Sequence, residues 1–441
     1  MKPELFFVPY GEKEILYAPL KRFIAEVNSS ARDAAARRLL GIPMSDAQQG
    51  FIESLDKHGI FDDAAPPQID STFAPTRVTL FPSDRCNLRC RYCYASAEKG
   101  GHRLPVPVAR AAIDLIIKNA KSKGLNSFSV GFHGNGEPFS AFGVIAECCD
   151  YISFAAEQNQ MKYAVSTATN GVMSEECLDY MLAWITDVNV SSDILPDIQN
   201  SQRPLADGGA SFEYADHTLK RLNAAGVQFG IRATITDESV HRLHEMAEFV
   251  KEHYPKCRLL HFEPVYEVGR ALKTGQTTPD PKTFVHEFLK ARAALENSGI
   301  RLVFSGERAD TLCCCFCSVC NNGFTVTAEG NVTSCYEICT YQDIRAERFV
   351  YGKYDDETEQ FIFDADIMAN LANLHVSNIP YCRDCFCKWH CGGDCLAKTL
   401  GVKSPEEHAG SERCVITRAL IYRQILIKMG VDVTQLEPVF L

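Results

Sequence analysis

The sequence predicts an α/β protein in which a barrel of parallel strands precedes a cysteine-rich domain. From Pro75 onward, short apolar runs alternate with amphipathic helical segments, which is the pattern of parallel strands joined by right-handed crossovers. In the last third of the 441 residues, cysteines concentrate at positions 313–339 and 382–414, and this concentration marks a separate module. We therefore expect an N-terminal extension at 1–72, a barrel at 73–300 and a cysteine-rich domain at 301–441.

Charge and cysteine content narrow the possible functions. The formal net charge is -11 and the sequence contains no long Lys/Arg run, so we expect no nucleic-acid partner. We find no signal-peptide cleavage pattern and no run of eighteen apolar residues, and we expect a cytoplasmic protein without a membrane partner. Because the cytosolic thiol pool keeps disulfides reduced, the 20 cysteines favour metal binding.

The N-terminal extension is predicted to be a small α+β unit. Two short apolar runs flank Tyr10-Gly11-Glu12-Lys13 and would pair as a hairpin. Two helical segments follow, and the second begins on Ser45 with Gln48 three residues later, which is a capping-box pattern. The predicted elements are strands at 5–8 and 15–17 and helices at 20–40 and 45–58.

Six parallel strands can be placed in the barrel. They are residues 78–82, 128–133, 163–168, 187–191, 228–234 and 259–264. In barrels of this kind, catalytic side chains collect at the carboxyl ends of the strands. In this chain, the candidate site residues of the barrel described below lie at or near the carboxyl ends of the predicted strands.

A loop with the spacing CxxxCxxC follows the first strand and contains Cys86, Cys90 and Cys93. Three thiolates on one loop can hold an iron-sulfur cluster and leave one iron open, whereas zinc or three unrelated thiols are the alternatives. With Tyr92 in its aromatic position, the loop resembles that of the radical S-adenosylmethionine (SAM) superfamily. The resemblance implies a [4Fe-4S] cluster that binds SAM, on a partial (β/α)6 barrel similar to a TIM barrel.

The turn after the second strand, Gly134-Asn135-Gly136-Glu137-Pro138, resembles the GGEP turn of the same superfamily. Its glycine-rich backbone lets carbonyl groups approach the SAM ammonium group, and Glu137 can add a charge-assisted hydrogen bond. By itself, the segment is also compatible with a strand-to-helix turn that binds nothing.

Further SAM contacts follow from the resemblance alone. It implies that Ser191 and Arg232 contact the SAM carboxylate and that Asn170 and Asp193 lie near the ribose. An arginine suits a carboxylate because its planar guanidinium donates two parallel hydrogen bonds, although a single arginine on a strand is often part of an ion pair.

The cysteine spacing of the last third resembles the SPASM extension of radical SAM enzymes, with two auxiliary [4Fe-4S] clusters and thus three clusters in all. The first implied cluster takes Cys320, Cys335, Cys395 and one thiol from Cys313, Cys314, Cys315 or Cys317, among which Cys314 has the preferred spacing. The second takes Cys382, Cys385, Cys391 and Cys414. A pair of zinc ribbons is the alternative.

The resemblance implies a radical SAM oxidoreductase that matures a ribosomally made precursor peptide, by a thioether, carbon-carbon or ether cross-link or by side-chain oxidation. It also implies a reducing partner such as flavodoxin or ferredoxin, and the N-terminal extension is similar to leader-recognition domains.

A sulfatase-maturing oxidase is a second possibility, but those relatives have an Asp after the Cys335 position, where this chain has Tyr336 and Glu337. Candidate bases are Glu337, Glu263 and Tyr336. An iron-sulfur electron carrier or a zinc-binding scaffold is the alternative of another class.

Overall fold

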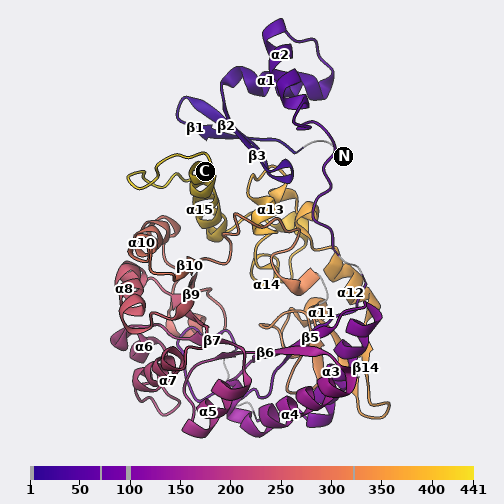
Figure 1. Cartoon of the computed structure of the whole chain (residues 1–441), viewed down its shortest axis with the longest axis vertical. Coiled ribbons are helices and arrows are strands. Elements are labelled where there is room, and N and C mark those ends of the chain that lie inside the picture. The colour runs from indigo at the N-terminus through magenta and orange to yellow at the C-terminus, as the bar shows by residue number, and fades with distance from the viewer. Residues whose placement is uncertain (1–3, 70–71, 96–100, 321–322) are drawn as a thin grey trace.

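The computed structural model describes residues 4–69, 72–95, 101–320 and 323–441 of the chain. Within them, the largest sheet has the strand order β10-β9-β8-β7-β6-β5-β4-β11-β12-β13-β14. A second sheet, β1-β2-β3, lies beside the C-terminal helix (Figure 1). The structure thus consists of a barrel, a cysteine-rich domain that continues its sheet, and a small N-terminal unit.

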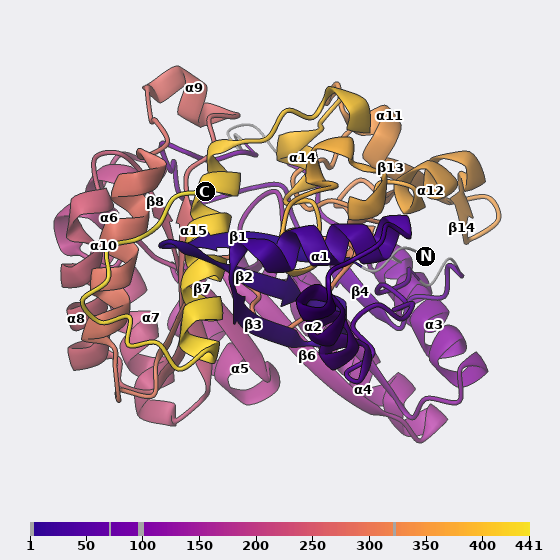
Figure 2. The ribbon, with the colours of Figure 1, turned by 90° about the horizontal axis from the view of Figure 1, so that it is seen from above.

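The predicted α/β barrel is confirmed. Its strands are parallel and its helices lie on the outside (Figures 1 and 2). The strands are β4 (Arg77–Leu80), β5 (Ser127–Phe132), β6 (Lys162–Thr169), β7 (Asp187–Ser191), β8 (Phe229–Ile235), β9 (Cys257–Pro264) and β10 (Arg301–Val303). The helices are α3 (Val106–Ser122), α4 (Phe142–Asn159), α5 (Glu175–Trp184), α6 (Pro196–Gln202), α7 (Phe212–Ala225), α8 (Leu243–His253), α9 (Arg270–Thr274) and α10 (Pro281–Ala294).

Side-chain alternation gives the barrel an apolar outer layer and an open inner face. Along β8, Phe229, Ile231 and Ile235 are buried in the main core, whereas Arg232 is exposed. Because successive side chains of a strand point to opposite faces, Arg232 points into the barrel. Its register partner on β9, His261, lies on the same face. The inner face is therefore accessible to a ligand.

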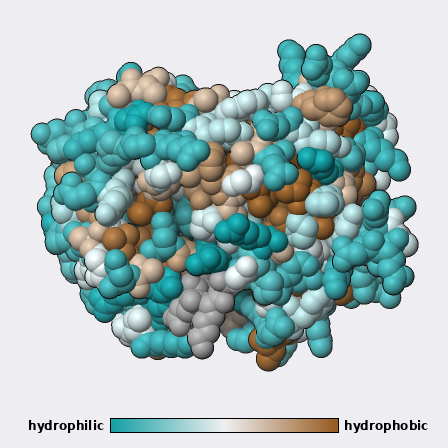
Figure 3. Space-filling model, turned by 90° about the horizontal axis from the view of Figure 1, so that it is seen from below, coloured by the Kyte–Doolittle hydropathy of each residue, from teal (hydrophilic) through white to brown (hydrophobic). Residues whose placement is uncertain are grey.

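Helix α4 with the turn before it (138–159) is long and apolar enough to cross a membrane by length and composition. Its residues Ile145, Cys148 and Ile152 are instead fully buried in the main core. The face of the molecule shown in Figure 3 is largely hydrophilic, with separate hydrophobic areas between polar residues. We describe α4 as a core helix of the barrel, because packing against the sheet accounts for its apolar side.

The cysteine-rich domain adds antiparallel strands to the barrel sheet through β11, which pairs in parallel with β4. Strands β11 and β12 form an antiparallel hairpin. The domain consists of β11 (Thr325–Val326), β12 (Asn331–Thr333), β13 (Val350–Asp355), β14 (Gln360–Phe363), α11 (Ala346–Phe349), α12 (Ala365–Ala372), α13 (Lys388–Cys391), α14 (Leu396–Thr399) and α15 (Glu412–Lys428). Most of its cysteines lie on short turns between these elements.

The N-terminal unit has three strands, not the predicted two, and the helix predicted at 20–40 is wrong in its first part. The unit consists of β1 (Phe6–Tyr10), β2 (Lys13–Ala18), β3 (Phe23–Val27), α1 (Ser29–Leu40) and α2 (Asp46–Asp56). The Asn28 side chain accepts hydrogen bonds from the backbone N–H groups of Ser30 and Ala31, so the helix begins only there. The expected capping box of Ser45 and Gln48 is confirmed.

The small sheet has two buried faces. On β2, Leu16 and Ala18 pack against the helices of the unit itself. Ile15 and Tyr17 point the other way and pack with Cys387 and with apolar residues of α15. The Tyr17 hydroxyl is hydrogen-bonded to His390, and Glu4 pairs with Lys388 and Trp389. The N-terminal unit is therefore fastened to helix α13 of the cysteine-rich domain.

Candidate functional site

The thiols of Cys86, Cys90 and Cys93 converge at the carboxyl end of β4. Burial raises the pKa of Cys86 to about 11, and the charges of Glu137 and Cys93 contribute. Burial likewise raises the pKa of Cys90 to about 12, with further increments from Cys93 and Cys86. Among the residues that the structure describes, no three metal-binding side chains close on a single ion. A four-iron cluster holds its cysteines apart by the irons between them, so this donor set fits a cluster better than one zinc ion.

The predicted turn at Asn135 and Gly136 lies directly against the cysteine loop. A Cβ atom on Gly136 would lie 2.1 Å from the carbonyl oxygen of Arg85, so only glycine fits there. The backbone N–H of Glu137 donates to the same oxygen at 2.7 Å. The buried Asn135 Oδ1 has no hydrogen-bond partner within the described parts of the chain. An unpaired acceptor beside the cysteine loop fits the ammonium group that the resemblance places here.

Glu137 joins the ends of β5 and β6. Its carboxylate accepts hydrogen bonds from Thr169 Oγ1 at 2.6 Å and from the Asn170 N–H at 2.7 Å. Burial raises its pKa to about 7, against the effect of these hydrogen bonds. The contact of Glu137 with SAM stays a prediction, because both carboxylate oxygens already have partners inside the protein.

A buried network that the sequence did not reveal supports the cysteine loop from behind. The Tyr92 hydroxyl donates to Asp193 Oδ2 at 2.6 Å, and Arg203 Nη1 donates to the same hydroxyl at 2.8 Å. Asp193 is 0% exposed, and its Oδ1 accepts from the Thr234 N–H. Asp193 therefore positions Tyr92, and its predicted place near the ribose stays a prediction. Arg203 lies in the polar loop after α6, and nothing in its sequence context distinguishes it.

Asn170 also supports the loop. Its Nδ2 donates to Asn87 Oδ1 at 2.8 Å and lies 3.8 Å from the Cys86 sulfur, while its Oδ1 accepts from the Val172 N–H. All polar atoms of this side chain are thus occupied next to a cluster ligand. Its predicted position near the ribose is not tested by these contacts.

Ser191, Arg232 and His261 form a row across β7, β8 and β9. Arg232 is exposed to the barrel interior, and its Nη1 lies 3.3 Å from His261 Nδ1. His261 is not an anion, so Arg232 has no ion pair with it. The guanidinium can therefore bind a carboxylate without first losing such a pair. This position agrees with the predicted role in SAM binding, which stays a prediction.

The three candidate bases have different surroundings. Glu337 pairs with Arg345 at 2.6 Å and Glu263 pairs with Arg413, so both carboxylates are held by arginines. Tyr336 is 37% exposed and enters the barrel mouth, where its hydroxyl lies 2.9 Å from Thr79 Oγ1 and its ring stands 4.8 Å from that of His133. Of the three, Tyr336 is the one whose side chain is exposed, whereas Glu263 is buried.

The thiols predicted for the first auxiliary cluster are only partly brought together. Burial and the charges of Cys395 and Cys317 raise the pKa of Cys335, so these three sulfurs are neighbours. Cys320 instead forms a disulfide with Cys315, and a ligand role for Cys320 requires that pair to be reduced. The surroundings of Cys335 favour Cys317 as the additional thiol, whereas the sequence spacing favours Cys314.

The second predicted group does converge. Burial raises the pKa of Cys382 to about 12, and the Cys385 and Cys414 thiolates contribute. The Cys391 pKa is raised well above its usual value by burial and by the charges of Asp394, Cys414, Cys382 and Cys385. Four thiols from separate elements, which include Cys391 at the end of α13 and Cys414 at the start of α15, are therefore neighbours, and four thiolates are the donor set of a closed four-iron cluster.

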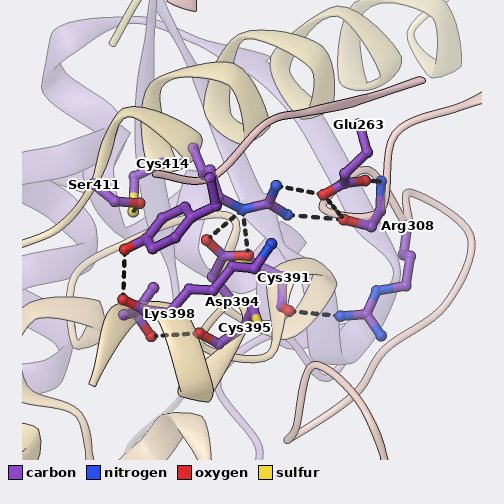
Figure 4. A network of polar contacts seen from close by, with 12 residues as sticks. Glu263, Arg308, Cys391, Asp394, Cys395, Lys398, Ser411 and Cys414 are labelled. Carbon is purple, nitrogen blue, oxygen red and sulfur yellow. Dashed lines mark hydrogen bonds and ion pairs between the residues drawn. The ribbon is translucent and has the colours of Figure 1, made fainter. Parts of the chain in front are cut away.

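A buried ionic network connects the barrel to both cysteine groups (Figure 4). Arg413 Nε donates to the carboxylate of Asp394 at 2.9 Å, and the Arg413 guanidinium also pairs with Glu263. Glu263 accepts a further hydrogen bond from Ser305 at 2.7 Å. Arg413 precedes Cys414 and Asp394 precedes Cys395, so each cysteine group has a neighbour in this network.

Comparisons with known proteins agree with this geometry. The family described as the Radical SAM superfamily matches residues 80–250. An uncharacterized protein of Methanocaldococcus jannaschii is 26% identical over 173 residues, which are 39% of this chain and 57% of that protein. The chain thus spans little more than half of that relative. A cysteine-type anaerobic sulfatase-maturating enzyme of Clostridium novyi is 21% identical over 322 residues, 69% of this chain and 83% of the relative.

Two solved structures share the fold at low sequence identity. The structure of anSMEcpe with bound AdoMet and Kp18Cys peptide has a TM-score of 0.62 and 18% identity, and covers 80% of this chain and 99% of that one. Streptococcus suis SuiB bound to precursor peptide SuiA has a TM-score of 0.55 and 14% identity, and covers 93% of this chain and 99% of that one. At identities this low, the likeness shows the fold of the chain, which is a barrel with a three-cysteine loop and a cysteine-rich domain. Residues 80–250, which match the Radical SAM superfamily, include the three-cysteine loop and strands β5 to β8.

Proposed function

We propose that the enzyme matures a ribosomally made precursor peptide by forming a cross-link or an oxidised side chain. The observation that carries this proposal is the extent of structural likeness. The match to peptide-bound SuiB covers 93% of the chain, whereas the match to anSMEcpe covers 80%. A coverage of 93% is more than the barrel and the cysteine-rich domain make up together, so the likeness to SuiB extends into the N-terminal unit.

The N-terminal unit is the proposed binding site for the leader segment of the peptide. Its sheet has two edge strands, β1 and β3, and an extended peptide can add a strand to such an edge through backbone hydrogen bonds. Leu5 and the first four residues of β1 also border a cavity of about 290 Å³ that reaches Cys385 and Arg418. A leader bound at β1 would thus lie beside the second cysteine group.

The cysteine loop of the barrel is the proposed site of the SAM-binding cluster, and the two C-terminal groups are the proposed sites of two auxiliary clusters. When bound, SAM and its cluster supply a 5'-deoxyadenosyl radical, which can remove a hydrogen atom from an unactivated C–H bond. The residues of the chain hold these groups, exclude water and position the target carbon. Arg232 orients the SAM carboxylate, and Tyr336 closes one side of the space in which the peptide would lie.

Maturation of a sulfatase is the second candidate, and it is favoured by the likeness to the Clostridium novyi relative and to anSMEcpe. The side chains after Cys335 argue against it. Tyr336 is hydrogen-bonded to Thr79 and Glu337 is paired with Arg345, so neither offers a free carboxylate at the barrel mouth.

An anaerobic assay tests the proposal and separates the alternatives. The purified enzyme is incubated with SAM, a reductant such as flavodoxin or ferredoxin, and a small peptide encoded beside its gene. We expect peptide-dependent formation of deoxyadenosine and a peptide that has lost two hydrogen atoms. Reaction only with a sulfatase peptide would favour the second candidate. An electron carrier or a zinc-binding scaffold would give no deoxyadenosine at all. We propose that this reaction takes place in the cytoplasm, where the thiol pool keeps cysteine ligands reduced.

A further inference from the structure

We propose that His261, held in place by Glu263, is the base that removes a proton from the peptide during its oxidation. This inference rests on the proposed function, because a peptide that forms a cross-link or an oxidised side chain loses two hydrogens. When bound, the cofactors supply the radical that takes one of them as a hydrogen atom and an oxidised iron-sulfur cluster that takes one electron. The other hydrogen leaves as a proton and needs an acceptor in the barrel.

The two neighbours of His261 determine which nitrogen carries its proton. Nε2 lies 2.7 Å from Glu263 Oε2, and Nδ1 lies 3.3 Å from Arg232 Nη1. A carboxylate can only accept and a guanidinium can only donate, so Nε2 bears the hydrogen and Nδ1 presents its lone pair. The lone pair therefore points along the inner face of the barrel toward the residue predicted to bind the SAM carboxylate. A SAM carboxylate bound to Arg232 would draw that guanidinium away and leave Nδ1 free.

Glu263 is suited to positioning the imidazole and to stabilising it after it takes the proton. The Glu263 carboxylate is held by Arg413 and by Ser305, and its side chain is only 6% exposed. The His261 side chain is 17% exposed, so it can be reached from the barrel interior. A buried carboxylate behind an accessible imidazole is the arrangement by which enzymes orient a histidine base.

The other groups on this face are poorly suited to accept the proton. His133 also has a ring that faces the barrel mouth, but its Nδ1 accepts a hydrogen bond from the Gly134 N–H at 2.7 Å. Its remaining nitrogen therefore carries the hydrogen, and burial and Arg232 lower its pKa to about 4. The Tyr336 hydroxyl is hydrogen-bonded to Thr79, and the carboxylates of Glu263 and Glu337 are each held by an arginine.

The charged groups that surround His261 are Arg232 on β8, Glu263 on β9 and Arg413 on α15. Burial and Arg232 lower the pKa of His261, Glu263 raises it, and Arg413 lowers it further. A SAM carboxylate bound to Arg232 would compensate the arginine's positive charge. One of the contributions that lower the pKa of His261 would then be removed. SAM binding should therefore make His261 a stronger base at the point in the cycle when the peptide is oxidised.

The decisive variant is His261→Gln, which can donate to Glu263 and accept from Arg232 but cannot take a proton. The assay follows deuterium transfer from a labelled precursor peptide into deoxyadenosine, together with the amount of modified peptide. We expect deuterium transfer to persist and modified peptide per deoxyadenosine to fall by a factor of roughly 10² to 10⁴, the usual contribution of a general base. His244→Gln, an exposed histidine on α8, is the matched control and should behave as the wild type.

An equal ratio of modified peptide to deoxyadenosine in His261→Gln and wild type would overturn the inference. Failure of the wild type itself to form peptide-dependent deoxyadenosine would instead overturn the proposed function. A second measurement does not depend on turnover. Exchange of the imidazole C2 hydrogen with deuterated solvent, followed by peptide mass spectrometry, reports the protonation of each histidine in the wild-type holoenzyme. Addition of SAM without reductant should move the exchange midpoint of His261 to higher pH and leave that of His244 unchanged, and an unmoved His261 midpoint would contradict the inference.

Discussion

The cysteine loop of the barrel and the cysteine groups of the C-terminal domain are held in different ways. The barrel loop is supported by buried hydrogen bonds from Tyr92, Asp193 and Arg203, and by the Glu137 turn behind it. Among the C-terminal cysteines, Cys391 and Cys395 lie at the four-residue helices α13 and α14, Cys414 lies in the first turn of α15, and most of the others lie on turns. The protein chain itself shapes the barrel loop, whereas we expect the C-terminal groups to depend more on the clusters that their thiols are proposed to hold. This difference determines what each substitution should do.

Removal of the barrel thiols should have the largest effect on activity and little effect on folding. In the variant with Cys86, Cys90 and Cys93 all replaced by Ala, SAM cleavage should be abolished, because no ligand remains for the SAM-binding cluster. Iron content should fall by about a third if three four-iron clusters are present. Deoxyadenosine formation under dithionite and iron analysis check this. Residual deoxyadenosine at the wild-type rate would show that SAM binds elsewhere.

Loss of one C-terminal ligand should affect structure as well as chemistry. Cys414→Ala is expected to abolish peptide modification, to spare slow SAM cleavage without peptide, and to open the turns around α13 to proteolysis. Limited proteolysis and peptide mass measure the two effects. Cys177→Ala, at a buried thiol on α5, is the control and should modify peptide normally. If Cys414→Ala resists protease like the wild type, the metal does not shape this region.

The buried network of the barrel should be costly to break. Arg203→Met leaves the carboxylate of Asp193, which is 0% exposed, without its cation, and we expect a loss of about 3 to 5 kcal/mol in the free energy of unfolding. The exposed Arg258 lies 3.9 Å from Asp187, and Arg258→Met should cost less than about 1 kcal/mol. Denaturant unfolding of both variants measures the two losses in the free energy of unfolding. Equal losses would show that the buried network contributes no more to stability than an exposed ion pair.

Arg232 should act on the ligand and not on the fold. Arg232→Ala should weaken SAM binding by about 1.5 to 3 kcal/mol, the value of a hydrogen bond to a charged group. Arg232→Lys should retain part of this affinity, because the charge remains while the two-pronged geometry is lost. Anaerobic titration of SAM gives the dissociation constants. An unchanged constant in Arg232→Ala would assign the residue to orienting His261 alone.

The smallest effect concerns the pH dependence of stability. Burial raises the pKa of Glu137 to about 7 from 4.5, so the folded state holds this proton more tightly than the unfolded state. The contribution of Glu137 to the free energy of unfolding is fully present below the pKa that it has in the unfolded chain. This contribution is lost as the pH rises through the folded pKa of about 7. The stability of Glu137→Gln relative to the wild type should therefore improve between about pH 5 and about pH 8. Thermal unfolding at both values measures it, and a constant difference would contradict the shift.

The sequence predicted the barrel well, because strand periodicity is a local pattern, and the cysteine spacing, also a local pattern, pointed to the loop after its first strand. It did not reveal Arg203 or His261, whose roles depend on strands and loops far apart in the chain. It also predicted a helix over β3, because Phe23 to Val27 carries no signal that outweighs the helical residues after it. The choice between Cys314 and Cys317 depends on how the turn folds, and spacing alone cannot determine it.

The attachment of the N-terminal sheet to helix α13 has a consequence for selectivity among positions in a peptide. Tyr17 contacts His390, Glu4 contacts Lys388 and Trp389, and Ile15 packs with Cys387, so the sheet cannot swing independently of the cysteine-rich domain. A leader gripped by that sheet would therefore be held at one separation from the barrel mouth. The number of residues between the leader and the target would then determine which residue reaches the barrel mouth. Lengthening or shortening that spacer would shift the modified position along the peptide.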